Sequence, residues 1–141
     1  MFLLDTNVVS ELRKVRAGKA DRNVSAWAGT VAAENLFLSV VVVLELEIGT
    51  RLTERRDPAQ GMLLRAWLVG QVLPAFTGRI LPVDEAVARR CAALHVPDPS
   101  PFRDGLIAAT ALVHGLIVVT RNVADFAASG VGLLNPWDLV L

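Results

Sequence analysis

Apolar residues follow two alternating patterns along the chain. Short uninterrupted runs rich in branched apolar residues predict buried strands, and they lie at residues 2–4, 36–39, 79–83, 116–120 and 131–137. Longer segments with apolar residues at every third or fourth position predict helices, at about residues 6–13, 24–32, 41–52, 60–76, 84–95 and 101–114. Strands separated by helices are typical of an α/β fold, so we expect a three-layer sandwich with a mainly parallel central sheet.

The segment "PSPFRDGLIAATALVHGLIVVTRNVADF", residues 99–126, contains one predicted helix and one predicted strand. The sequence predicts that Ser100 caps the helix and that Pro101 is its first residue. In a helix-then-strand unit of a parallel sheet the two elements run antiparallel, so the start of the helix and the end of the strand lie at the same edge. We therefore expect Asp104, in the first helical turn, and Asp125, just beyond the strand, to lie at one edge of the sheet.

The composition indicates what kind of protein carries these acids. The length of 141 residues predicts a single domain, and the net charge of zero argues against a protein that coats nucleic acid non-specifically. Apolar residues make up 53% of the chain and the mean hydropathy is +0.48, so we expect a partner subunit to cover some apolar surface. The longest uncharged run, residues 105–120, is shorter than the roughly 20 residues of a membrane-spanning helix, and so is the apolar run at residues 35–44. No secretion signal is apparent in "MFLLDTN", and the expected location is the cytoplasm.

Two further acids are predicted at the same edge. Ligands of parallel α/β sheets bind beyond the carboxyl ends of the strands. Asp5 directly follows the first predicted strand, and Glu45 lies in the second turn of the helix after strand 36–39. Helical side chains lean toward the start of their helix, which brings the Glu45 carboxylate back to this edge. We expect Asp5, Glu45, Asp104 and residues 120–125 to converge in space.

Each of these acids also has a structural explanation. Asp5 and Asp125 each precede a predicted helix that they can cap, and the helix macrodipole favours Asp104. Glu45 follows the apolar run "VVVL", where a solvated carboxylate is unexpected, whereas Glu47 is expected to face water. Three or four carboxylates at one edge would repel one another and raise their pKa values unless a cation lies between them. Oxygen ligands suit Mg²⁺ or Mn²⁺ and do not suit zinc.

Other kinds of site have little support in the sequence. His95 and His114 lie far apart in helical patterns, so we expect core or interface positions rather than a zinc site. Cys91 is expected to be a buried thiol. The chain has no phosphate-binding glycine motif and no Gly-x-Ser-x-Gly nucleophile motif. The sequence therefore predicts a site that works through a metal ion and water.

Three segments carry a family resemblance. "MFLLDTNVVSEL" at the start, "SVVVLELEIG" in the middle, and "FRDGLIAATALVHGLIVVTRNVADF" followed by "LLNPW" near the end resemble the PIN-domain ribonucleases. They resemble most specifically the VapC/FitB toxins of prokaryotic toxin–antitoxin pairs, and the match keeps order and spacing over nearly the whole chain. The resemblance implies a magnesium- or manganese-dependent endoribonuclease toxin. It assigns the catalytic and metal-binding roles to Asp5, Glu45 and Asp104.

The last motif departs from the family pattern at one position. The family often has a fourth acid directly after "TR", where this chain has Asn122. Either the Asn122 carbonyl binds a metal-bound water or Asp125 supplies the missing charge, so both are candidates for the metal site. The departure also leaves open a catalytically weak PIN protein that acts mainly by binding an antitoxin or RNA partner. Thr6, Asn7 and Thr120 resemble the family's small polar residues around the site, with an expected role as hydrogen-bond partners of the metal ligands.

The resemblance and the apolar excess together predict the partners. We expect an RNA substrate, a cognate antitoxin protein and a homodimer that forms a larger assembly with the antitoxin. The predicted dimer interface is made by the apolar faces of residues 24–32 and 62–73, which include Trp27 and Trp67.

Two arginines flank the predicted site. Arg103 and Arg121 are candidates for binding RNA phosphates, although exposed arginines on a solvated face are equally common. A basic residue of the antitoxin, most simply an arginine, is expected to enter the acidic site, because a guanidinium can pair with the carboxylates there.

Overall fold

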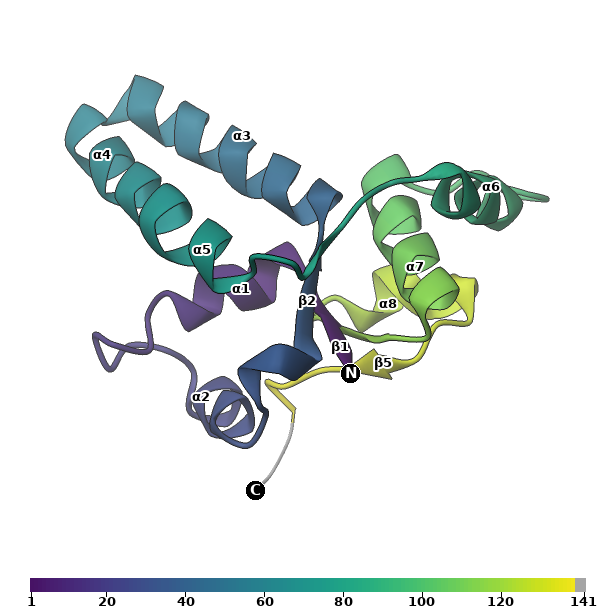
Figure 1. Cartoon of the computed structure of the whole chain (residues 1–141), viewed down its shortest axis with the longest axis horizontal. Coiled ribbons are helices and arrows are strands. Elements are labelled where there is room, and N and C mark those ends of the chain that lie inside the picture. Colours follow the sequence, from purple (N-terminus) through teal and green to yellow (C-terminus); the bar gives the residue numbers. More distant parts are fainter. Residues whose placement is uncertain (139–141) are drawn as a thin grey trace.

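Five parallel strands form the sheet at the centre of the fold (Figure 1). The computed structural model describes residues 1–138. The strands are β1 (Phe2–Leu4), β2 (Leu36–Ser39), β3 (Ile80–Leu81), β4 (Ile117–Val119) and β5 (Leu133–Leu134), in the order β3-β2-β1-β4-β5. Phe2 pairs with Leu36 on one side and with Ile117 on the other. The predicted α/β fold is confirmed, and in the described residues the sheet is wholly parallel.

Helices flank this sheet. They are α1 (Thr6–Leu12), α2 (Arg22–Gly29), α3 (Val40–Arg56), α4 (Pro58–Trp67), α5 (Leu73–Ala75), α6 (Glu85–Leu94), α7 (Phe102–His114) and α8 (Val123–Phe126), with short 3₁₀ turns at Ala33–Asn35 and Ala127–Ser129. In Figure 1, α1 and the α3–α4 hairpin lie to one side of the strands, and α6, α7 and α8 lie to the other. No helix in residues 1–138 is long and apolar enough to cross a membrane.

The order of the elements gathers helix starts at one edge of the sheet. α1 follows β1, α3 follows β2 and α8 follows β4, so these three helices begin where their strands end. α7 runs back before β4, and its first turn therefore lies near the same edge. This carboxyl edge is where parallel sheets bind ligands.

Two predicted helices are longer or shifted. α2 begins at Arg22 rather than at residue 24, because the Asp21 carboxylate accepts hydrogen bonds from the amides of Asn23 and Val24. α3 continues to Arg56, four residues beyond the predicted end. Both predicted helices are therefore present, and only their ends differ from the prediction.

The segment predicted as one helix over residues 60–76 is more irregular. It begins at Pro58, widens into a π-helical turn at Leu68–Val72 and ends in the short α5. The strand predicted over residues 79–83 is reduced to Ile80–Leu81. Pro82 follows it, and proline has no amide hydrogen for a further ladder bond.

The start of α7 differs from the prediction. Ser100 does not cap it. Pro101 is the N-cap residue, with extended backbone angles (φ −56°, ψ 131°), and makes no capping side-chain hydrogen bond. The helix begins at Phe102, which keeps Asp104 in the first turn. It ends as predicted at Gly115, whose left-handed φ of 67° suits a residue without a side chain.

The core is built from the strands and from the inner face of α7. Leu3, Leu4, Val118 and Val119 are completely buried, and Ile107 of α7 packs in the same cluster. Burial of each such side chain contributes about 1.5–3 kcal/mol. These residues hold the carboxyl edge of β1 and β4 in a fixed position.

Trp27 belongs to this core and not to an exposed face. Its side chain is only 4% exposed and meets the Phe2 ring edge-on, with 5.5 Å between ring centroids. The prediction that Trp27 lies in a dimer interface is therefore wrong. The alternation of apolar residues in residues 24–32 reports packing against β1 within the same chain.

The hairpin of α3 and α4 is held by a close approach and by charge pairs. A side chain at Gly61 would lie 2.4 Å from the Glu54 Cα atom, so only glycine lets the helices come this close. Arg65 of α4 pairs with Glu47 at 2.7 Å and with Glu54 at 2.8 Å, and Arg51 also pairs with Glu47. Glu47 therefore faces these arginines, and the prediction that it simply faces water is wrong.

Candidate active site

Asp5 stands at the junction of β1 and α1. Its amide donates to the Val119 carbonyl of the neighbouring strand, and its carboxylate caps α1 by accepting from the Thr6 amide at 2.8 Å. The residue is only 6% exposed. The capping explanation for Asp5 is thus correct, but it accounts for one carboxylate oxygen only.

The other Asp5 oxygen is bound by the residue that follows β4. Thr120 is completely buried, and its hydroxyl donates to Asp5 Oδ2 at 2.8 Å. The same hydroxyl accepts from the Asn122 amide at 3.0 Å and from Asn7 Nδ2 at 3.4 Å. Asn7 also accepts from the Arg121 amide at 3.3 Å. This network joins the ends of β1 and β4 and fixes the Asp5 carboxylate.

Glu45 reaches the same edge from α3. Its Oε1 accepts a hydrogen bond from the Thr6 hydroxyl at 2.8 Å, and Thr6 is the residue next to Asp5. Its Oε2 lies 3.8 Å from the Arg103 guanidinium of α7. Glu45 is thus placed between the starts of α1 and α7, as predicted from the lean of helical side chains.

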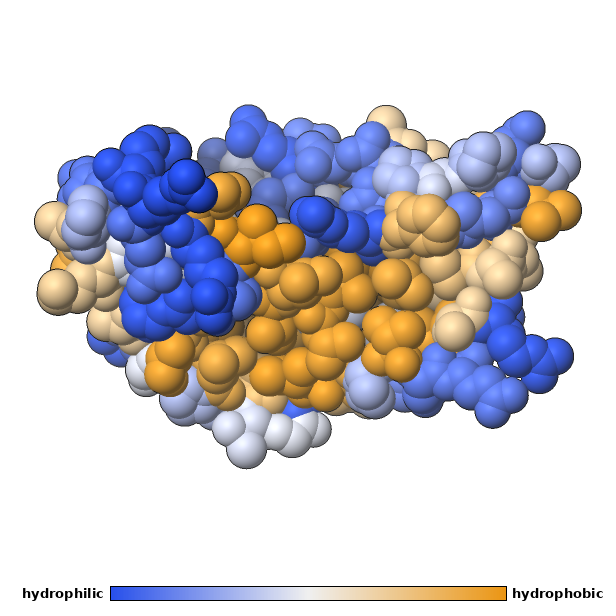
Figure 2. Space-filling view, turned by 90° about the horizontal axis from the view of Figure 1, so that it is seen from above, coloured by the Kyte–Doolittle hydropathy of each residue, from blue (hydrophilic) through white to orange (hydrophobic). Residues whose placement is uncertain are grey.

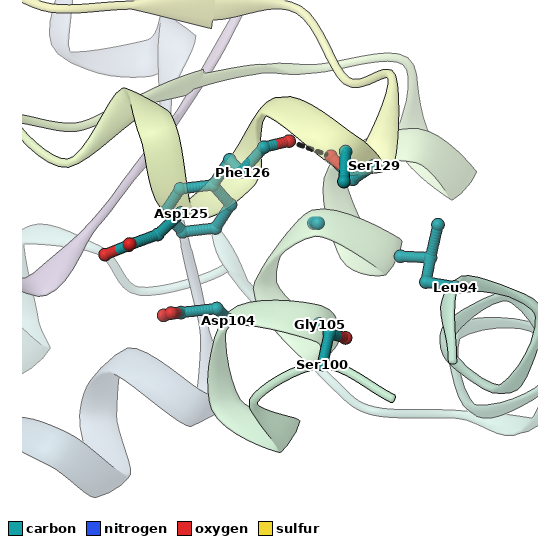
Figure 3. Close-up of a pocket in the computed structure, with 9 residues that line it drawn as sticks. Leu94, Ser100, Asp104, Gly105, Asp125, Phe126 and Ser129 are labelled. Carbon is teal, nitrogen blue, oxygen red and sulfur yellow. Dashed lines mark hydrogen bonds between the residues drawn. The ribbon is translucent and has the colours of Figure 1, made fainter. Parts of the chain in front are cut away.

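Asp104 and Asp125 lie on the remaining side of this edge. Both line a small cavity of about 40 Å³. Figure 3 shows that the two side chains extend in the same direction, one from α7 and one from α8. Ser100, Phe126 and Ser129 complete much of the wall. Nothing in the sequence placed these three residues at the site, because their approach depends on how α8 folds back onto α7.

Burial and like charges shift the acids at this edge. Burial raises the pKa of Asp5, and the charge of Asp125 raises it further, although the hydrogen bonds that Asp5 accepts act in the opposite direction. Burial also raises the pKa of Asp104, with additional contributions from the charges of Asp5, Asp125 and Glu45. The charges of Asp5, Asp125 and Glu45 therefore lie close enough to Asp104 to disfavour its ionisation.

At the fourth position of the site, neither Asp125 nor the Asn122 side chain caps α8. Asp125 is the third residue of α8, so the prediction that it caps this helix is wrong. Asn122 precedes α8 but makes no capping side-chain hydrogen bond. Both side chains are exposed, and Asp125 is the one whose charge acts on Asp5 and Asp104.

The two arginines have different surroundings. Arg103 lies against Glu45, with about half of its side chain exposed. The Arg121 guanidinium is placed 5.1 Å from the centre of the Trp137 ring instead, and only its amide contacts the acidic network, through Asn7. Of the two predicted phosphate-binding residues, Arg103 is thus the one whose charge lies beside an acid.

The chemistry of the acids fits a hard divalent cation, although their positions do not form a closed cage. Carboxylate oxygens are the ligands that Mg²⁺ and Mn²⁺ prefer, and a cation would relieve the repulsion that raises the pKa values of Asp5 and Asp104. Across residues 1–138, no three His, Cys, Asp or Glu side chains come together closely enough to hold a metal as they stand. Glu45 in particular is bound by Thr6 and leans on Arg103.

The histidines and the cysteine lie away from this edge. Cys91 is buried in α6, as predicted, and His95 Nδ1 is 2.9 Å from the Cys91 carbonyl oxygen. His114 is exposed at the end of α7. The Cys91 sulfur lies 4.0 Å from His95 Nδ1, whereas His114 lies at the other end of α7, so the two histidines do not form a pair.

Comparisons with known proteins agree with this geometry. The model of the PIN domain family matches residues 2–128. The "VapC ribonuclease Y4jK" of Sinorhizobium fredii is 39% identical, over 98% of this chain and 99% of the relative. "Toxin FitB" of Neisseria gonorrhoeae is 38% identical, over 97% of this chain and 99% of the relative. The crystal structure of FitAcB from Neisseria gonorrhoeae contains a chain that superposes with a TM-score of 0.88 at 38% identity, covering 99% of this chain and 100% of that one.

Proposed function

The chain belongs to the PIN-domain family and is a homologue of the VapC/FitB toxins, and from this premise we propose that it is a metal-dependent endoribonuclease. In this proposal residues 1–141 act as one nuclease domain, and the protein is the toxin of a toxin–antitoxin pair. It hydrolyses RNA phosphodiester bonds in the cytoplasm. The metal is Mg²⁺ or Mn²⁺.

One observation carries the proposal. Four carboxylates from four different segments lie at the carboxyl edge of the sheet, and burial together with the charges of the other three raises the pKa of Asp104. Such repulsion destabilises the fold and is expected where a functional cation compensates it. The relatives' printed names, a ribonuclease and a toxin, support the same reaction class.

Asp5, Glu45 and Asp104 are the proposed ligands and catalytic acids, with Asp125 rather than Asn122 as the fourth acid. A bound divalent cation would supply an activated water and stabilise the charge of the departing 3′ oxygen. Hydrogen bonds fix the ligands: Thr120 and the Thr6 amide hold Asp5, and the Thr6 hydroxyl holds Glu45. Fixed ligands need little reorganisation when the phosphodiester binds.

Other side chains have supporting roles. Arg103, beside Glu45, provides a guanidinium for the RNA phosphate. One of the carboxylates at the edge would accept the proton from the attacking water. Asn7 keeps Thr120 oriented toward Asp5.

A cleavage assay on total tRNA tests the proposal. We expect products in Mg²⁺ and none in EDTA, and none from Asp104→Asn. Asp57→Asn is the matched control, since Asp57 is exposed at the start of α4 and asparagine caps a helix equally well. Equal cleavage in EDTA, or by Asp104→Asn, would contradict the proposal. A complete absence of metal-dependent products would instead favour the catalytically weak PIN protein that binds an antitoxin or RNA.

The proposed partners are an antitoxin and a second copy of the chain. Figure 2 shows a broad apolar area on the face of the molecule seen from above. Exposed apolar residues lie on α3 and α4, among them Leu44, Leu52, Met62 and Leu63. With Trp27 in the core, these exposed residues are the better candidates for a homodimer interface. A monomer at micromolar concentration in light scattering would contradict the dimer.

The proposed antitoxin acts on the acidic edge. Several solved relatives are toxin–antitoxin complexes, including FitAcB. We propose that a basic residue of the antitoxin enters between the acids, because a guanidinium can pair with carboxylates that otherwise repel one another. Inhibition that survives replacement of every basic residue in the antitoxin tail would contradict this part.

A further inference from the structure

An exposed aromatic ring stands beside the acidic edge. Phe102 is the first residue of α7 and is 74% exposed, an unusual state for a phenylalanine. One face of its ring packs on His95, with 4.9 Å between ring centroids and a tilt of 33°. His95 is itself held by its contact with the Cys91 carbonyl. The ring therefore has one supported face and one face open to solvent.

The protein surface next to the Phe102 ring is apolar and accessible to solvent. Between α6 and α7 lies a hollow of about 390 Å³, lined by Ala88, Cys91, Ala92, His95, Phe102 and Leu106. In volume it has ample room for a flat heterocycle. The small side chains on the α6 side leave the hollow shallow and accessible.

The position of Phe102 relates it to the acids. Asp104 lies two residues further along the same helix, about 3 Å along the helix axis and about 200° around it, so Phe102 faces α6 while Asp104 faces α8. Arg103, between them, is half exposed and lies 3.8 Å from Glu45. An aromatic ring, a guanidinium and a catalytic acid therefore follow one another at the start of α7. An RNA strand that passes over the start of α7 can therefore bring a flat base to the ring and an anionic phosphate to the guanidinium.

We propose that Phe102 is a stacking platform for an RNA base adjacent to the phosphodiester that is cleaved. The base lies on the open face of the Phe102 ring and over the apolar hollow, while Arg103 meets the phosphate. The inference rests on the proposed ribonuclease function and adds a substrate-binding residue to it. Stacking on an aromatic side chain tolerates any base, because every base has a π-face.

The first test measures binding without cleavage. The probe is a short single-stranded RNA with one 2-aminopurine, whose fluorescence falls when it stacks, mixed with the Asp104→Asn protein in Mg²⁺. Adding Phe102→Ala is expected to weaken binding by about tenfold and to abolish the fluorescence loss. Phe102→Trp should restore both, and Phe102→Leu should restore neither. Val15→Ala, at a site that is 42% exposed in the turn after α1, is the control and should bind like the parent.

The second test uses the cleaving protein. Phe102→Ala should raise KM by about tenfold with little change in kcat, because stacking holds substrate and transition state alike. Unchanged RNA binding and unchanged KM would overturn the inference. A shift from dimer to monomer in light scattering, with RNA binding unaffected, would also overturn it, since a second copy of the chain would then cover Phe102. If the wild type never cleaves RNA, the proposed function fails, but a Phe102-dependent fluorescence loss would still support the platform.

Discussion

Helix α3 carries acids in two contrasting situations. At its start, Glu45 joins the carboxyl edge, where like charges and burial raise the pKa of Asp104. Further along, Glu47 and Glu54 meet Arg65, whose hydrogen bonds lower the pKa of both and bring that of Glu47 to about 2. Helix α3 thus contributes to one region in which the acids repel one another and to another in which an arginine neutralises them.

The contrast separates acids that stabilise the fold, in the α3–α4 hairpin, from acids that are available for function, at the carboxyl edge. In the hairpin both Glu47 and Glu54 pair with Arg65, so their charges are balanced within the chain. At the carboxyl edge the donors to Asp5 and Glu45 are neutral hydroxyl and amide groups, with Arg103 as a distant cation. An edge arranged in this way is suited to bind a cation from outside.

Loss of a single edge acid is expected to have the largest effect. Asp5→Asn, Glu45→Gln and Asp104→Asn should each lower the rate of RNA cleavage by more than about 100-fold, since changes one step removed from a metal already cost 10–100-fold. Circular dichroism should show an unchanged fold. Cleavage within tenfold of wild type by any of the three would remove that residue from the site.

The hairpin is broken most effectively at Gly61. Alanine there would place its Cβ 2.4 Å from the Glu54 Cα atom, so the helices must separate. We expect a loss of about 1–3 kcal/mol in the free energy of unfolding, measured by urea titration. Gly70→Ala is the control, because a side chain at Gly70 meets nothing within 4 Å. Equal stability of both variants would show that the hairpin does not need the close approach.

The fourth position is expected to have an intermediate effect. Asp125→Asn should lower metal affinity or cleavage by about tenfold if its charge helps to hold the cation. Asn122→Asp tests the alternative, because a new acid there should tighten metal binding only if that side chain faces the site. Unchanged cleavage by both variants would mean that three acids suffice.

The smallest expected effect is on the pH dependence of stability. The contributions of the hairpin and of the carboxyl edge to the free energy of unfolding should change in opposite directions as the pH rises. Glu47 has a lowered pKa, so its contribution to stability is present above its ordinary value of 4.5 and is lost as the pH falls toward about 2. Asp5 and Asp104 have raised pKa values, so their cost is absent below their ordinary value of 3.8 and grows as the pH rises above it.

Two substitutions separate these contributions in the metal-free protein. Asp104→Asn should gain stability over wild type between pH 4 and 7, and Glu47→Gln should lose it over the same range, both followed by thermal unfolding in EDTA. High salt should shrink the Glu47 effect, because that pair is only partly buried and ions can still screen it. Changes of the same sign in both variants would contradict the contrast.

Much of the fold was predictable because it rests on local pattern. The uninterrupted runs around Leu3 and Val118 mark strands that are buried on both faces, and Gly115 ends α7 as its conformation requires. The placement of Asp5 and Glu45 followed from the rule that parallel strands end at one edge. These features need only the periodicity of a segment and its neighbours.

The rest depends on contacts between segments. The sequence pattern around Trp27 is the same whether the residue lies in the core or in an interface. Only its contact with Phe2 shows that it belongs to the core. The pairing of Arg65 with Glu47 depends on the register of two helices, which no single segment reveals. Asp125 lies inside α8 rather than before it because the helix starts directly after Asn122.

Thermal unfolding of wild type and Asp104→Asn, with and without Mn²⁺, tests whether the acids at the carboxyl edge form a binding site for a divalent cation. We expect Asp104→Asn to unfold at a higher temperature than wild type in EDTA, because repulsion at the edge is relieved. Millimolar Mn²⁺ should then stabilise wild type by several degrees and leave the variant unchanged, since only the native metal site links binding to stability. An Asp104→Asn protein that is less stable in EDTA and gains as much from Mn²⁺ as wild type would contradict the account.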